Sequence, residues 1–210
     1  MPTSSRRGTW FTLACVLLLG LFLVRNGAGE GTGGPPQPRA AAPAHKSAAD
    51  PLPAAPGPLP HSPPRRIAVP SLRVDAPLTE VGLDADGWVD APPLANSNLA
   101  GWYRSAVSPG ERGTSVVVGH VDNPAGPAVF YSLGSLQRGS RIEILRGDGR
   151  TAVFAVYAVQ VFAKKGFPAE RIYRDTPRPE LRVITCGGEY TEKTGYDGNV
   201  VASARLTAVR

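Results

Sequence analysis

Short runs of apolar, β-branched residues dominate the last two thirds of this chain and limit what it can fold into. From residue 67 onward these runs are 4 to 12 residues long, and Gly, Pro, Asn or Asp bounds each of them. No stretch keeps a 3.6-residue periodicity, and only residues 129–136 suit a helical turn. Seven or eight short strands in about 144 residues predict an all-β barrel or sandwich. The runs are residues 67–70, 71–78, 114–121, 141–149, 151–162, 180–185 and 199–206.

One hairpin stands out among these runs. Asp148-Gly149 separates the alternating sequences RIEILR and TAVFAVYAV. Gly adopts a positive φ at little cost, so an Asp-Gly pair between two alternating runs favours a tight turn. We therefore expect antiparallel strands on either side of it.

The segment before these strands has a different composition. Residues 26–66 hold eleven prolines and almost no branched or aromatic side chains. Such a segment cannot bury a core, so we expect a disordered linker here and a folded domain over residues 67–210. Fully extended, the linker would reach on the order of 120 Å, and as a flexible coil about 40 Å. His45 and His61 fall within it and are expected to be solvated.

An apolar run at the N-terminus, Thr9–Val24, is preceded by Arg6 and Arg7 and followed by Arg25. As a helix it would rise about 24 Å, slightly less than the roughly 30 Å hydrocarbon core of a bilayer. It is therefore a signal-peptide core or a membrane anchor with snorkelling arginines. We favour an uncleaved anchor over residues 1–25, because Arg25 directly follows the core and no small-x-small triplet does. The expected protein crosses the cell membrane once, with its folded domain outside.

Charge and cysteine content exclude several classes of partner. The net charge is +6, but residues 1–66 carry seven Lys/Arg against two acids, and residues 67–210 carry sixteen against fifteen. The folded part is nearly neutral, so we expect no nucleic-acid partner. The two cysteines, Cys15 and Cys186, lie far apart, which excludes a disulfide framework. No CxxC pair or His/Cys cluster is present, and we predict no metal or organic cofactor.

The predicted domain contains one histidine, His120, and one cysteine, Cys186. Each ends an apolar run, SVVVGH and LRVITC, so each is expected at a strand end where a barrel exposes side chains. A cysteine attacks as the thiolate, and a neighbouring imidazole can take its proton. The alternative is an inert buried cysteine and an unrelated loop histidine, and residue types alone leave both open.

Three sequences resemble the sortase family. They are TCGG after ELRVI, the upstream VVVGHVDNPAGPAVFYSLGSLQRGSRIEI, and RIAVPSLRVDAPL at the start of the domain. They occur in family order across residues 67–208 and resemble the actinobacterial, class F-like sortases that carry a Thr-Cys-Gly-Gly signature. The resemblance implies an eight-stranded sortase-like β-barrel with short helical turns. It also implies a cysteine transpeptidase that an N-terminal helix tethers outside the membrane. The tether agrees with the anchor expected above from the apolar run.

The resemblance also implies roles for two residues. Cys186 would attack the carbonyl after the Thr of an LPxTG-like sorting signal, forming a thioester and expelling the downstream peptide. His120 would protonate that leaving amine and later accept a proton from an amine acceptor of the cell wall.

The chain departs from the family at a third position. Many sortases place an arginine at the start of the strand after the cysteine, and here that position is Asn199. An Asn amide can donate to an oxyanion, so we nominate Asn199 as the third catalytic residue, against the alternative that it only caps a turn. Arg205 is expected about 20 Å further along its strand, and Arg182 about 13 Å before Cys186.

Two further groups of residues have alternative readings. Asp122 and Asn123 can orient the imidazole of His120, but Asp-Asn-Pro favours a turn. Trp88, Trp102 and Tyr103 can line a groove, but large aromatics in a small barrel favour the core.

Two other functions stay open beside the transpeptidase, the first of them because of the missing arginine. One is a non-catalytic sortase-like module that binds or scaffolds at the cell surface. The other is a cysteine hydrolase, in which water rather than an amine resolves the thioester.

Overall fold

A computed structural model describes residues 34–38 and 56–210 of the chain. The predicted anchor over residues 1–25, most of the predicted linker, Cys15 and His45 lie outside the described residues. Within the described ranges, no helix has both the length and the apolar character needed to cross a membrane.

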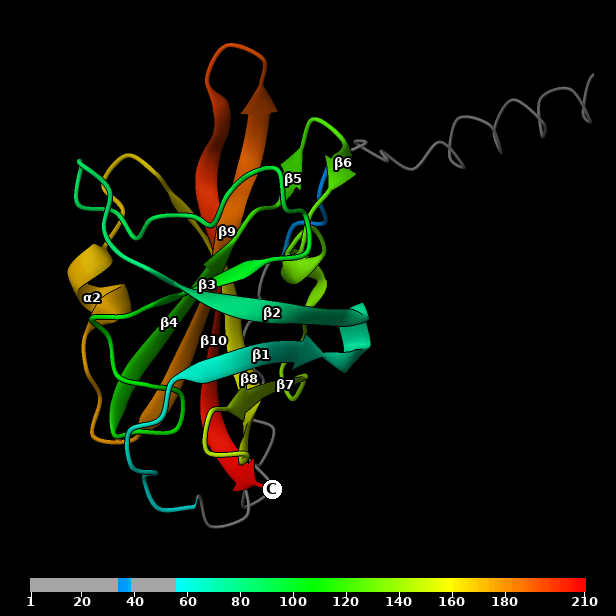
Figure 1. Cartoon of the computed structure of the whole chain (residues 1–210). Coiled ribbons are helices and arrows are strands. Elements are labelled where there is room, and N and C mark those ends of the chain that lie inside the picture. Colours follow the sequence, from blue (N-terminus) through cyan, green and yellow to red (C-terminus); the bar gives the residue numbers. More distant parts are fainter. Residues whose placement is uncertain (1–33, 39–55) are drawn as a thin grey trace, which may run out of the picture. The chain divides into compact units, whose positions relative to one another are not determined.

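Eight strands close into a barrel in the order β1-β2-β3-β4-β9-β10-β8-β7 (Figure 1). Neighbouring strands are antiparallel except for the pairs β2–β3 and β4–β9, which are parallel. The prediction of an all-β, eight-stranded barrel is confirmed. The strands are β1 (Pro64–Val69), β2 (Val74–Val81), β3 (Ala100–Tyr103), β4 (Gly113–Gly119), β7 (Arg141–Arg146), β8 (Thr151–Ala163), β9 (Pro179–Thr191) and β10 (Gly195–Val209).

Short elements connect the barrel strands. They are β5 (Asp122–Asn123), β6 (Gly126–Pro127), the 3₁₀ turns η1 (Pro70–Leu72) and η2 (Leu133–Ser135), and the helix α2 (Ala169–Tyr173). The helical turn expected within residues 129–136 is confirmed as η2. Sequence analysis missed β3 and α2, because four or five residues are too few to establish a periodicity.

The predicted hairpin is formed by β7 and β8. Arg146 N donates to Arg150 O at 2.9 Å and closes the turn. Gly149 has φ +81° there, as an Asp-Gly turn requires.

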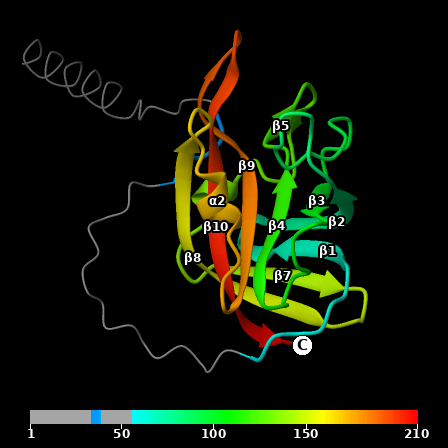
Figure 2. The same cartoon turned by 90° about the vertical axis from the view of Figure 1, so that its left-hand side faces the viewer.

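The two faces of β9 and its neighbours belong to different apolar clusters. Leu181 and Val183 point into the barrel, where the main core lies. Ile184 points outward and packs with Val118 and Val201 in a second cluster. The helix α2 covers that cluster through Ile172, and Figure 2 shows α2 beside β9 and β10. The outer face of β9 and β10 is thus partly covered by α2. Cys186 lies on this same face of β9, two residues after Ile184.

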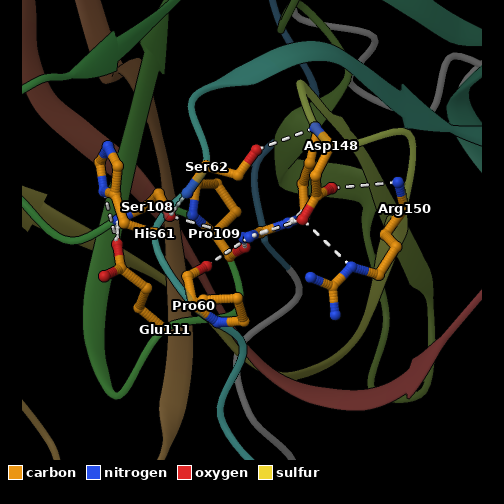
Figure 3. A network of polar contacts seen from close by, with 9 residues as sticks. Pro60, His61, Ser62, Ser108, Pro109, Glu111, Asp148 and Arg150 are labelled. Carbon is orange, nitrogen blue, oxygen red and sulfur yellow. Dashed lines mark hydrogen bonds and ion pairs between the residues drawn. The ribbon is translucent and has the colours of Figure 1, made fainter.

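The barrel holds residues that precede its first strand (Figure 3). Arg146 is only 1% exposed, and its guanidinium donates to the carbonyls of Pro60 and Pro109. The same group forms an ion pair of 3.2 Å with Asp148. A buried guanidinium needs several acceptors, and these carbonyls and the carboxylate supply them.

These contacts move the start of the folded domain upstream of residue 67. β1 begins at Pro64, Leu59 N donates to Gly110 O at 2.8 Å, and Ser62 N donates to Ser108 Oγ at 3.1 Å. His61 is exposed, with Nδ1 3.1 Å from Glu111 Oε2 (Figure 3). Composition did not predict this boundary, because backbone groups rather than apolar side chains make most of the contacts.

Candidate active site

The fold brings His120 and Cys186 to the same level of the sheet. β4 and β9 are parallel neighbours whose register pairs Val118 with Ile184, so two further residues along each chain lead to His120 and Cys186. Side chains alternate along a strand, so Cys186 belongs to the outer face that Ile184 occupies, and His120 directly follows β4. The predicted pair therefore lies at the same end of the parallel β4–β9 ladder.

Thr185 fastens these two strand ends together. Its buried Oγ1 donates to Gly119 O at 2.8 Å. Gly119 immediately precedes His120, and Thr185 immediately precedes Cys186, so this bond fixes the backbone from which both side chains project. Sequence analysis did not single out Thr185, because a Thr in a β-branched run reads as an ordinary strand residue.

A backbone carbonyl orients the half-buried imidazole of His120. Its Nε2 lies 2.7 Å from Pro92 O. A carbonyl oxygen only accepts, so Nε2 carries a proton in this hydrogen bond, and Nδ1 is left to exchange a proton with a thiol or an amine. Sequence gives no signal for such a partner, because Pro92 contributes only its backbone.

Cys186 is half-buried and is the one free cysteine in the described part of the chain. The expectation that its strand ends at the cysteine is wrong, because β9 continues to Thr191 and pairs with β10. The parallel ladder with β4 does stop earlier, at Ile184. Cys186 thus lies two residues beyond the β4 ladder, while β10 beside it still pairs with β8 as far as Gly198, and the β9–β10 hairpin projects from the barrel beyond these residues (Figure 1).

A β-bulge that begins two residues after Cys186 explains the second glycine of TCGG. The register shifts so that Gly188 and Glu189 face the single residue Asp197. Gly188 has φ +85°, and a Cβ on it would fall 2.1 Å from Asp197 Oδ1. A Cβ on Gly187 would fall 2.5 Å from the side chain of Val200. A larger residue at Gly188 would disrupt the bulge, and one at Gly187 would displace the side chain of Val200.

Asn199 is the cross-strand partner of Cys186 in the β9–β10 ladder. Directly opposite residues project on the same face with Cβ atoms about 5 Å apart, so the amide can reach a group bound to the sulfur. The alternative that Asn199 caps a turn is wrong, because β10 begins at Gly195. On its other side Asn199 pairs with Phe162 of β8.

Neither nearby arginine takes the place of Asn199. Arg182 is 7% exposed and pairs with Glu180 at 2.7 Å, with its guanidinium 5.8 Å from the centre of the Tyr157 ring. These partners hold it toward the start of β9, away from Cys186. Arg205 pairs in register with Glu180, six residues from the cysteine.

Asp122 and Asn123 build a turn and do not orient His120. Asn123 Oδ1 accepts from Ala125 N at 2.9 Å, which closes the β5–β6 turn. Asp122 accepts a hydrogen bond from the hydroxyl of Tyr196. Burial, together with this bond to a carboxylate, raises the pKa of Tyr196. The turn interpretation is confirmed.

The aromatic residues divide between core and surface. Trp102 is 3% exposed and confirms the core interpretation, whereas Trp88 is 36% exposed and its tilted ring has its centre 5.4 Å from that of Phe167. Phe167 also lies 6.0 Å from Phe162, the neighbour of Asn199 in the sheet. Tyr103 packs against the outer apolar cluster. Apolar side chains on the outer face therefore continue from Phe162, the neighbour of Asn199, toward α2.

Comparison with known proteins decides the family. A family model described as the sortase domain matches residues 67–207. The chain belongs to the sortase family. Sortases are generally cysteine transpeptidases.

Solved sortases have the same fold. Sortase A of Listeria monocytogenes is 18% identical with a TM-score of 0.53, covering 72% of this chain and 90% of its own. Sortase SrtA of Actinomyces oris is also 18% identical with a TM-score of 0.53, covering 78% and 89%. Sortase C-1 of Actinomyces oris is 19% identical with a TM-score of 0.53, covering 68% and 73%. No curated protein matches the chain in sequence.

Proposed function

We propose that this sortase cleaves an LPxTG-like sorting signal through a thioester on Cys186 and transfers the protein to an amine acceptor of the cell wall. The observation that carries the proposal is the pairing of Cys186 with Asn199 in the β9–β10 ladder, with His120 directly after β4 at the same end of the β4–β9 ladder. The TCGG sequence, in which Gly188 supplies the positive φ of the bulge, supports membership of the class F-like group.

The first half-reaction forms the thioester. His120 takes the proton of the Cys186 thiol, and the sulfur attacks the carbonyl carbon after the Thr of the signal. Negative charge develops on that carbonyl oxygen, where the side-chain amide of Asn199 donates a hydrogen bond. The imidazolium then gives its proton to the leaving amine, and the carbon–nitrogen bond breaks. Pro92 O, which accepts from Nε2, supports the positive ring in between.

The second half-reaction reverses the proton transfers. An incoming amine attacks the thioester carbon while His120 accepts its proton, and the carbon–sulfur bond breaks to leave a new amide. The side-chain amide of Asn199 also donates a hydrogen bond to the oxyanion of this second tetrahedral intermediate. The cysteine and histidine then return to their starting states, so the cycle requires no cofactor.

We propose that residues 1–25 anchor this chemistry at the cell membrane, with the catalytic domain outside. The apolar run between basic residues supports the anchor. Such a position suits a reaction between a translocated protein and a cell-wall precursor.

Product analysis separates the transpeptidase from its alternatives. The full chain in detergent is incubated with an LPxTG-type peptide library, with and without an added amine peptide. A transpeptidase yields an amide-linked product only when the amine is present. Free acid in both reactions identifies a hydrolase, and bound but intact peptide identifies a binding module.

A further inference from the structure

The carbonyl that orients His120 belongs to the connection between β2 and β3, residues 82–99. Pro92 O lies 2.7 Å from His120 Nε2, and Pro92 is buried, whereas Ala91 and Pro93 on either side of it are exposed. A loop carbonyl stays at hydrogen-bond distance only if the loop around it is fixed. The contacts that fix this connection therefore decide how well the imidazole is held.

Two side-chain amides fix the part of the connection after Pro92. Asn123 Nδ2 of β5 donates to Leu94 O at 3.0 Å. Asn98 Nδ2 donates to Asp75 O of β2 at 3.2 Å. These bonds hold the chain on one side of the Pro92 carbonyl only.

The part before Pro92 is a small hairpin over residues 82–90, closed by a β-bridge between Leu83 and Val89. Asp84 Oδ1 accepts from Trp88 N at 2.8 Å, and Asp84 N donates to Trp88 O at 2.8 Å. Both partners of each bond lie in the hairpin. The bonds keep its shape, but they do not fix it to the barrel.

Two apolar side chains, Trp88 and Val89, join this hairpin to the barrel. Val89 packs against the outer apolar cluster. The ring centre of Trp88 lies 5.4 Å from that of Phe167, which belongs to the connection between β8 and α2. Phe167 is held in turn by Tyr173 of α2, at 6.1 Å between ring centres. Trp88 is the largest side chain of the hairpin, and aromatic pairs stabilise a contact beyond the area they bury.

The chain between Trp88 and the carbonyl is short and stiff. Only three residues separate Trp88 from Pro92. Proline fixes φ at residues 92 and 93, and each residue that precedes a proline is restricted to extended backbone. A displacement of the hairpin is therefore passed on to Pro92 O instead of being absorbed by the loop.

We propose that Trp88 is a positioning residue for His120. By packing on Phe167 it fixes the hairpin, and the stiff segment 91–93 then holds Pro92 O where it accepts from Nε2. Nε2 keeps its proton in this bond, which leaves Nδ1 to exchange protons in the reaction. The hydrogen bond does not depend on the proposed transpeptidase, whereas the effect of Trp88 on turnover rests on it.

The test uses three variants of the full chain in detergent. Trp88→Ala removes the ring, and Trp88→Phe keeps an aromatic side chain to pack on Phe167. Leu83→Ala is the matched control, because Leu83 is a large apolar residue of the same hairpin but is 51% exposed.

Two readouts are measured. Nitrogen-15 NMR of the imidazole rings gives the exchange rate of the Nε2 proton of His120, whose signal is assigned by its loss in His120→Gln. Steady-state kinetics with an LPxTG-type peptide give kcat and KM separately. In Trp88→Ala, loss of one hydrogen bond predicts proton exchange about two to ten times faster, with kcat lower by a similar factor and KM unchanged. Trp88→Phe and Leu83→Ala should behave like the wild type.

Unchanged exchange of the Nε2 proton in Trp88→Ala overturns the proposal. A raised KM with unchanged kcat also overturns it, because Trp88 would then contact the peptide itself. Equal changes in Leu83→Ala overturn it as well, since any loosening of the hairpin would have the same effect. If neither the wild type nor any variant turns over the peptide, the transpeptidase proposal fails, and the exchange rates alone decide whether Trp88 positions His120.

Discussion

Asn199 lies directly across the β9–β10 ladder from Cys186, on the same face of the sheet. If its amide donates to the developing oxyanion, Asn199→Ala should lower the acylation rate by roughly 10² to 10³. The thermal midpoint should barely change, because the bond acts in the transition state rather than in the fold. Single-turnover acylation and thermal unfolding measure the two quantities.

Arg205→Ala is the matched control for this change. Arg205 is on the same strand but pairs with Glu180, six residues from Cys186, so its removal should leave acylation close to the wild-type rate. A larger loss of acylation in Arg205→Ala than in Asn199→Ala would show that an arginine stabilises the oxyanion.

Thr185 ties the strand ends that carry the reacting side chains. Thr185→Val keeps the shape but removes the side-chain donor to Gly119 O. We expect a loss of about 1 to 3 kcal/mol in unfolding free energy, together with slower acylation because His120 and Cys186 lose their shared support. Denaturant unfolding and acylation kinetics test both effects.

Thr114→Val separates stability from positioning. Thr114 is buried near the opposite end of β4, where its Oγ1 donates to Arg174 O at 2.7 Å. Thr114→Val should lose about as much unfolding free energy as Thr185→Val. Its acylation rate should stay at the wild-type value at a temperature where both variants are folded. Equal slowing in both variants would mean that Thr185 matters only for stability.

The barrel was predictable from sequence because its strands are alternating or fully apolar runs bounded by turn residues. His120 and Cys186 were predictable as unusual residues at the ends of such runs. The partners that position them were not, since Pro92 acts through a backbone carbonyl and Thr185 looks like any strand residue. The continuation of β9 through Cys186 depends on a bulge, which periodicity does not reveal.

The start of the domain was misplaced for a related reason. A proline-rich sequence predicts an unpacked linker, but proline carbonyls are good acceptors for a buried arginine. Arg146 uses Pro60 O in this way, so residues before 67 join the domain.

Arg146 therefore contributes strongly to stability. Arg146→Met keeps much of the volume but leaves the carbonyls of Pro60 and Pro109 without their buried donor. We expect a loss of about 2 to 4 kcal/mol in unfolding free energy. Arg150→Met removes an exposed partner of the same Asp148 and should cost less than about 1 kcal/mol. Equal losses in denaturant unfolding would contradict a special role for the buried guanidinium.

Asp148 links this network to pH. Burial disfavours its ionised form, but hydrogen bonds from Arg146 and the backbone of Arg150 outweigh burial and lower its pKa. Ionised Asp148 therefore stabilises the fold above the ordinary Asp pKa of about 4, and the effect disappears as the pH falls through the lowered value. The wild type should exceed Asp148→Asn in stability at pH 7, and the two unfolding curves should converge in acid. A gap that stays constant with pH would exclude this linkage.

The most direct test of the transpeptidase proposal is the intact mass of the full chain after brief exposure to an LPxTG-type peptide library. We predict a peptide adduct that maps to Cys186, is released by hydroxylamine as a thioester, persists in Cys15→Ala and disappears in Cys186→Ala. Peptide cleavage by Cys186→Ala at the wild-type rate, or the lack of any adduct on Cys186 in the wild type, would contradict it.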